Sequence, residues 1–72
     1  MNADKLLGII KENGDTQESL AYAIGISRSR LSAKIHERDG AVFTQPEILA
    51  IKRRYALDDE MLNVIFFNDF VS

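Results

Sequence analysis

Residues 16–35 constrain the fold of this chain more than any other stretch, because their pattern predicts two short helices joined by a tight turn. Thr16 and Ser27 are suited to cap the two helix starts, since a hydroxyl oxygen can accept from an unpaired backbone N–H. Gly25 lies between the helices and can adopt the positive φ that reverses a chain without strain. The apolar residues at helical spacing are Leu20, Ala21 and Ile24 in the first helix, and Leu31 and Ile35 in the second. The segment therefore predicts a helix-turn-helix.

The segment before this pair predicts one more helix, over about residues 3–12. It ends at Asn13-Gly14, a pair that favours a left-handed stop. Gly8 lies inside this helix at a cost of about 1 kcal/mol relative to alanine, and we expect close helix packing as the compensation. The residues expected on its buried side are Leu6, Ile9 and Ile10.

The second half of the chain predicts a loop over residues 37–43 and then two helices. Phe43 is expected to anchor the loop to the core. Thr44 and Glu47 form a capping box, so a fourth helix of about residues 45–55 begins there. The residues expected to face inward are Ile48, Ile51 and Tyr55 in the fourth helix, and Met61, Leu62, Ile65 and Phe66 in a fifth helix that Asp58 caps. These elements predict a compact, all-α, five-helix fold.

Composition limits the chain to one small domain, residues 1–72, because 72 residues with 46% hydrophobic content support a single core. With no cysteine and one histidine, disulfide bonds and the usual zinc sites are excluded. The first residues include Asp4 and no long apolar run, so we expect neither a signal peptide nor a membrane span. A cytoplasmic protein fits these features.

The helix-turn-helix residues match a known pattern, and the matching residues are Thr16-Gln17, Leu20-Ala21, Ile24-Gly25-Ile26-Ser27 and Leu31. This string resembles the helix-turn-helix, about residues 16–36 here, of the lambda-repressor and Cro (XRE-type) family of DNA-binding regulators. The resemblance implies a sequence-specific regulator of transcription, a Cro-like repressor from a phage or another mobile element. It also implies a homodimer that binds double-stranded DNA at a pseudo-palindromic operator.

The distribution of charge bears on this expectation more than its total does. The formal net charge of −2 is not that of a strongly basic domain. Residues 28–38, however, carry four basic residues against one acidic residue, a net charge of +3. At physiological salt the Debye length is roughly 8 Å, so this local field persists while distant acidic residues are largely screened. The positive block coincides with the second helix of the pair.

The resemblance implies individual roles for the residues of the second helix, which would read DNA. The expected base contacts are Arg28, Ser29, Ser32 and Ala33, and the expected phosphate contacts are Gln17, Arg30, Lys34, His36 and Arg38. Alternative interpretations are a solvated arginine near a phosphate for Arg28 and an ordinary surface histidine for His36. Lys34 departs from the family, most of whose members carry an apolar, inward-facing residue there; we expect Ile35 to take over that role.

The end of the chain is rich in aromatic residues, and exposed apolar patches often mark partner sites. The residues that we expect to form a homodimer contact are Phe66, Phe67, Phe70 and Val71. The alternative is that the phenylalanines fold back and complete the monomer core. A protein of a different class, an antirepressor-like or antitoxin-like interaction module, would use the same tail to bind another protein.

No pattern in the chain predicts catalysis, a cofactor or a small-molecule ligand. One histidine and no cysteine leave no set of nucleophile, base and orienting group, and no phosphate-binding loop is present. Asp58-Asp59-Glu60 is the one motif that suggests a metal site or a nuclease, and helix capping explains it better. Lys52-Arg53-Arg54 likewise suits the C-terminal end of a helix dipole rather than a second DNA contact.

Overall fold

The computed structural model describes residues 1–67, and this range contains five α-helices, one 3-10 turn and no strand. The elements are α1 (Ala3–Glu12), α2 (Gln17–Ile24), α3 (Arg28–Ile35), η1 (Arg38–Gly40), α4 (Gln45–Tyr55) and α5 (Asp59–Phe66). The predicted all-α, five-helix fold is confirmed. No helix in the described range is long and apolar enough to cross a membrane.

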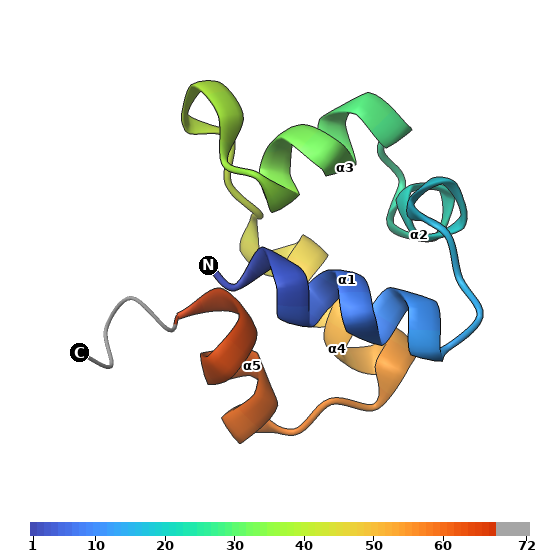
Figure 1. Cartoon of the computed structure of the whole chain (residues 1–72), viewed down its shortest axis with the longest axis vertical. Coiled ribbons are helices and arrows are strands. Elements are labelled where there is room, and N and C mark those ends of the chain that lie inside the picture. Colours follow the sequence, from blue (N-terminus) through green and yellow to red (C-terminus); the bar gives the residue numbers. More distant parts are fainter. Residues whose placement is uncertain (68–72) are drawn as a thin grey trace.

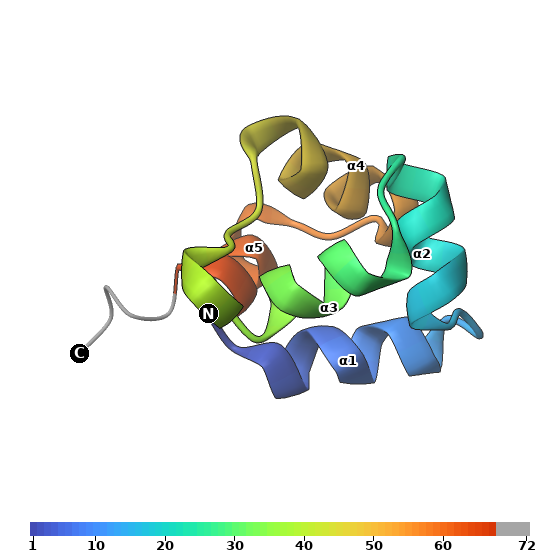
Figure 2. The same ribbon diagram turned by 90° about the horizontal axis from the view of Figure 1, so that it is seen from above.

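The helices enclose a single core, and α3 lies at one surface of it. Figure 1 shows α1 across the middle of the molecule and α3 along the upper edge, with no helix beyond it. In the perpendicular view of Figure 2, α3 crosses between α1 and α4. Within the described residues, no other helix covers the outward side of α3.

Local signals set the helix starts. The side chains of Thr16, Ser27 and Asp58 each accept a hydrogen bond from the backbone N–H three residues on, as predicted. Thr44 and Glu47 form the predicted reciprocal capping box. A second box, in which the Ser19 hydroxyl accepts from the Thr16 backbone N–H, was not predicted.

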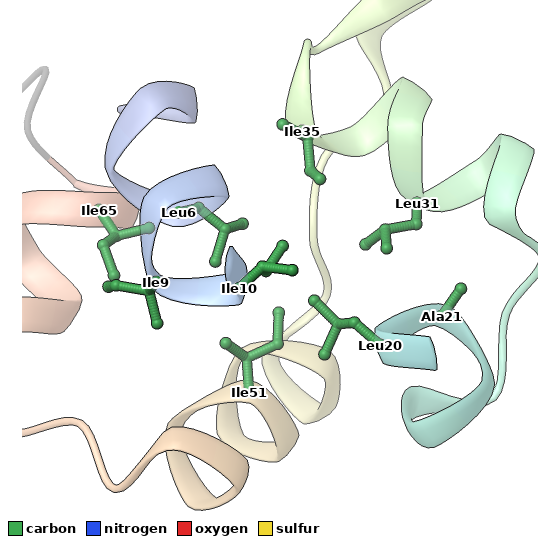
Figure 3. Close-up of a cluster of buried hydrophobic side chains, with 9 residues drawn as sticks. All are labelled: Leu6, Ile9, Ile10, Leu20, Ala21, Leu31, Ile35, Ile51 and Ile65. Carbon is green, nitrogen blue, oxygen red and sulfur yellow. The ribbon is translucent and has the colours of Figure 1, made fainter. Parts of the chain in front are cut away.

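The core takes at least one fully buried side chain from every helix (Figure 3). The buried apolar residues are Leu6, Ile9 and Ile10 of α1, Leu20 and Ala21 of α2, Leu31 and Ile35 of α3, Ile51 of α4 and Ile65 of α5. Of the other residues expected to face inward, Tyr55, Met61 and Phe66 are partly buried against this cluster. Each large-to-alanine change in such a core typically costs about 2–5 kcal/mol.

The structure confirms the expectation for one glycine and contradicts the expectation for another. Gly25 has φ +81°, which confirms its role in the turn between α2 and α3. Gly8 is exposed, and a Cβ added there would meet nothing within 4 Å. The expected close packing of another helix against Gly8 is therefore wrong, because that side of α1 faces solvent.

The connection between α3 and α4, predicted as a loop, contains the short η1 turn. Glu37 and Asp39 both have φ +52°, a left-handed conformation that is uncommon for residues other than glycine. Phe43 packs against the core as predicted, and its ring centroid lies 5.5 Å from that of Phe66 in an edge-to-face arrangement. This contact fixes the far end of the connection.

One carboxylate joins the turn before α2 to the end of α4. Asp15 accepts hydrogen bonds from Arg54 Nε and Nη2 at 2.8 Å each, from the Tyr55 hydroxyl at 2.7 Å and from the Ser19 hydroxyl at 3.0 Å. The Arg54 and Tyr55 hydrogen bonds hold the pKa of Asp15 well below its usual range. Burial, together with the neighbouring carboxylate, raises the pKa of Tyr55 to about 12. The start of the helix-turn-helix is thereby fastened to α4.

Candidate nucleic-acid interface

Backbone hydrogen bonds close the turn between α2 and α3. The Gly25 N–H donates to the Tyr22 carbonyl at 3.2 Å, and the Ile26 N–H donates to the Ala21 carbonyl at 3.0 Å. These bonds satisfy carbonyls that would otherwise be unpaired at the end of α2. Ser27 follows at once and caps α3 by accepting from the Arg30 N–H at 3.1 Å. α2 and α3 are thus two short helices joined by a tight, hydrogen-bonded turn.

The two faces of α3 have opposite character. Leu31 and Ile35 point into the core (Figure 3), and both are almost completely buried. The outward residues Arg28, Ser29 and Arg30 are exposed, while Ser32 and Ala33 are half-buried. All four expected base contacts therefore retain some exposed surface.

Several predicted DNA contacts come together around one open, polar hollow. It is lined by Gln17, Arg28, Ser29, Ser32 and Arg38. These residues come from the start of α2, from α3 and from η1, so three separate segments supply donors to one place. The Arg38 guanidinium also donates a hydrogen bond from Nη2 to the Ser32 hydroxyl. We call these five residues the polar face.

Lys34 does not belong to the exposed surface, and its expected phosphate contact is wrong. Its exposed fraction is 7%, and its Nζ donates to Glu47 Oε1 at 2.6 Å and to Oε2 at 2.8 Å. The reason is helical spacing: Lys34 lies three residues after Leu31 and so shares its inward face. Ile35 is buried as expected, but Lys34 is buried beside it rather than displaced from the core.

Glu47 is the partner that the sequence interpretation missed. Partial burial raises the pKa of its carboxyl, but the hydrogen bonds from Lys34 and Thr44 outweigh this effect and hold the pKa below its usual value. The same carboxylate accepts from the Thr44 backbone N–H at 2.9 Å. The Glu47 side chain therefore caps α4 and also neutralises the Lys34 ammonium of α3. The sequence does contain a signal for such a partner: Lys34 lies at an inward-facing position, and a buried ammonium requires an acidic partner.

The positive charge of this region comes from arginines alone. Within residues 1–67, no ion pair uses Arg28, Arg30 or Arg38. Lys34 is neutralised by Glu47, and the one acidic residue of the block, Glu37, pairs with the N-terminal amine at 2.7 Å. The net charge of +3 predicted for residues 28–38 thus persists as three exposed guanidinium groups.

The remaining predicted contacts that keep exposed surface do not line the polar face. Arg30 is exposed on the first turn of α3, and Ala33 is half-buried in the middle of the helix. His36 ends α3, is exposed, and donates its backbone N–H to the Ser32 carbonyl at 3.1 Å. Neither Arg30 nor His36 lines the hollow of the polar face.

The aromatic residues expected at a dimer contact divide into three groups. Phe66 is partly buried against the core and against Phe43, as the alternative of a completed monomer core requires. Phe67 keeps 40% of its surface exposed. Phe70 and Val71 lie outside the described residues.

The second basic run and the acidic run have structural partners. Lys52 pairs with Asp59 at 2.8 Å, and Arg54 pairs with Asp15. Asp58 caps α5 by accepting from the Met61 N–H at 2.8 Å. No group of three or more potential metal ligands gathers anywhere in residues 1–67.

Comparison of the chain with protein-family models, with characterised proteins and with solved structures finds no match.

Proposed function

We propose that this chain is a sequence-specific, double-stranded DNA-binding regulator of transcription that inserts α3 into the major groove. The observation that supports the proposal is the polar face, where donors from α2, α3 and η1 surround one hollow at the open side of a helix-turn-helix. Three exposed arginines without ion pairs in the described range add a local field that attracts phosphates. A repressor that blocks a promoter is the simplest regulator of this kind.

The contacts divide into those that read bases and those that hold the backbone. Arg28 and Ser29 lie on the first turn of α3, the part of a recognition helix that meets base edges. Arginine can donate two hydrogen bonds to guanine O6 and N7, which discriminates against a wrong base by roughly 1–3 kcal/mol. Gln17 begins α2, where backbone N–H groups and the helix dipole suit a phosphate. Arg30 and Arg38 add ionic contacts to phosphates on either side.

The proposal includes a symmetric homodimer. Two copies would place their α3 helices in successive major grooves roughly 34 Å apart, so the operator would be pseudo-palindromic. Phe67 is an exposed apolar side chain that a second copy can cover.

Selection of bound duplexes from a random pool tests the proposal. The wild type should enrich one motif, and Arg28→Ala should flatten the preference at one position of each half-site. Gln17→Ala should weaken all sequences about equally, because a phosphate contact carries no base information. Arg53→Ala is the matched control, since Arg53 is an exposed arginine at the far end of α4.

The control variant should enrich the same motif as the wild type. If the wild type enriches no motif, or if Arg28→Ala and Arg53→Ala give the same profile, the base-reading role of α3 is contradicted. Repeating the selection over a salt series separates specific binding from non-specific ionic binding, whose affinity falls steeply with salt.

A second candidate function, a protein-interaction module, is favoured by one other surface. An apolar hollow lies between the N-terminus, the connection before α4, and α5, and its apolar side chains include Val42, Phe43, Ile48, Phe66 and Phe67. A chain that binds no DNA but forms a stoichiometric complex with another protein, lost on Val42→Asp, would support this function over the first.

A further inference from the structure

We propose that Arg38 is a specificity-determining residue of the polar face, which acts through Ser32. This inference rests on the proposed function and assigns Arg38 a role beyond its phosphate contact. The observation is the hydrogen bond from Arg38 Nη2 to the Ser32 hydroxyl, which spans six residues and links η1 back to α3. Both side chains line the hollow of the polar face.

The hydrogen bond changes what the Ser32 hydroxyl can offer to DNA. A serine hydroxyl has one donor and two acceptor lone pairs, so alone it can serve a base acceptor or a base donor equally. Arginine is always charged and can only donate. Once Arg38 occupies a lone pair, its positive charge beside Ser32 Oγ opposes the approach of any further donor. The Ser32 hydroxyl is then committed to donating.

The local backbone keeps Arg38 in place for this role. The Ala41 N–H donates to the Arg38 carbonyl at 2.9 Å, and the Glu37 N–H donates to the Lys34 carbonyl at 3.3 Å. Glu37 and Asp39, on either side of Arg38, both have the left-handed φ of +52° that turns the chain back over α3. The Glu37 carboxylate is paired with the N-terminal amine and does not compete for the guanidinium.

The donors and acceptors of the major groove determine which base the Ser32 hydroxyl would favour. Guanine presents two acceptors there and no donor, whereas cytosine presents an amino donor and adenine presents a donor beside its acceptor. A hydroxyl that only donates, next to a guanidinium, therefore favours guanine at the position it faces. Thymine O4 is the second choice, and cytosine is the least favoured base.

A double-mutant comparison tests this inference with duplex selection as the readout. The variants are Arg38→Ala, Ser32→Ala and the double variant, and the expected change is a roughly tenfold loss of guanine preference at one position per half-site. Arg38→Ala and Ser32→Ala should both relax that same position. In the Ser32→Ala background, Arg38→Ala should weaken all sequences uniformly, because there is no hydroxyl left to orient.

Arg30→Ala is the matched control, since Arg30 is an exposed arginine on the same helix and outside the hollow. It should lower affinity for all sequences without changing the motif. If Arg38→Ala behaves like this control and leaves the base preference intact, Arg38 is a phosphate contact only and the inference is overturned. A wild type that selects no motif would instead contradict the proposed function, so the two failures are distinguishable.

Discussion

Two backbone positions carry an amino acid that is poorly suited to their conformation. Gly8 lies inside α1 with open space around it, and Ala56 ends α4 with φ +51°. Gly8→Ala should raise the free energy of unfolding by about 1 kcal/mol because alanine favours the helix. Ala56→Gly should raise it by about 1 kcal/mol because glycine adopts left-handed φ without a Cβ clash. Urea denaturation of the purified variants measures both changes.

Gly25→Ala serves as the opposing control for these substitutions. Gly25 has φ +81° at the turn of the helix-turn-helix, so an added Cβ is strained there although space is open around it. This variant should be less stable than the wild type, by about 1 kcal/mol or more. A stabilised Gly25→Ala, or a destabilised Gly8→Ala, would show that backbone conformation does not govern these positions.

At the scale of the elements, the hydrogen bonds that join Asp15 to Arg54 and Tyr55 of α4 predict a pH dependence of stability. The pKa of Asp15 is lower in the folded chain than its ordinary value near 4. Its stabilising effect is therefore fully present above about pH 4 and is lost as the pH falls below that value. Asp15→Asn should lower the melting temperature at pH 7, and the difference from wild type should shrink as the pH is lowered toward 2.

Thermal melts of both proteins between pH 2 and pH 7 measure this convergence. Glu12→Gln is a suitable control because Glu12 is exposed at the end of α1. That variant should stay close to the wild type at every pH. A constant difference between Asp15→Asn and the wild type over the whole range would contradict an ionic role for Asp15.

The Lys34–Glu47 ion pair between α3 and α4 predicts that substituting one partner lowers the stability more than substituting the other. Glu47→Gln leaves the Lys34 ammonium buried without a counter-charge, which should cost on the order of 3 kcal/mol. Lys34→Leu instead leaves the Glu47 carboxylate with its hydrogen bond from the Thr44 N–H at the N-terminal end of α4, where the helix dipole favours negative charge, so this change should cost less. Denaturation of the two variants at pH 7 ranks them, and equal losses would contradict this interpretation.

Sequence reasoning predicted the elements better than the contacts between them. The helix starts at Thr16, Ser27, Thr44 and Asp58 depend on residues close in the sequence, so the sequence alone predicts them. The ion-pair partners cannot be predicted in this way. Arg54 lies 39 residues from Asp15, and Glu47 lies 13 residues from Lys34 and is one of several acidic residues in the chain. Choosing the correct partner requires the packing of α4, which no local pattern encodes.

The candidate site shows the same division. The outward positions of Ser29 and Arg30 followed from the period of α3, because Leu31 and Ile35 fix which side is buried. The approach of Arg38 to Ser32 did not follow, since it depends on the left-handed residues of the connection after α3. The sequence predicted only a loop there, and a loop prediction does not say where its side chains point.

For the molecule as a whole, the prediction concerns its assembly. We expect a homodimer in solution, with Phe67 in the contact because its ring is exposed beside the C-terminal end of α5. Phe67→Asp should shift sedimentation from dimer to monomer, since an unpaired charge in an apolar contact is costly. Tyr22→Ser is the control, because Tyr22 is 88% exposed on α2 and its loss should leave the dimer intact. A wild type that sediments as a monomer at high concentration would refute the assignment.

Helix α4 touches both ends of the helix-turn-helix, through Arg54 to Asp15 before α2 and through Glu47 to Lys34 near the end of α3. A unit tied at two points has few alternative orientations relative to the rest of the domain. Little conformational entropy then remains to be lost when a ligand binds, so affinity is not reduced by an ordering cost. The backbone of α2 and α3 should accordingly move by less than about 1 Å between the unbound and bound protein.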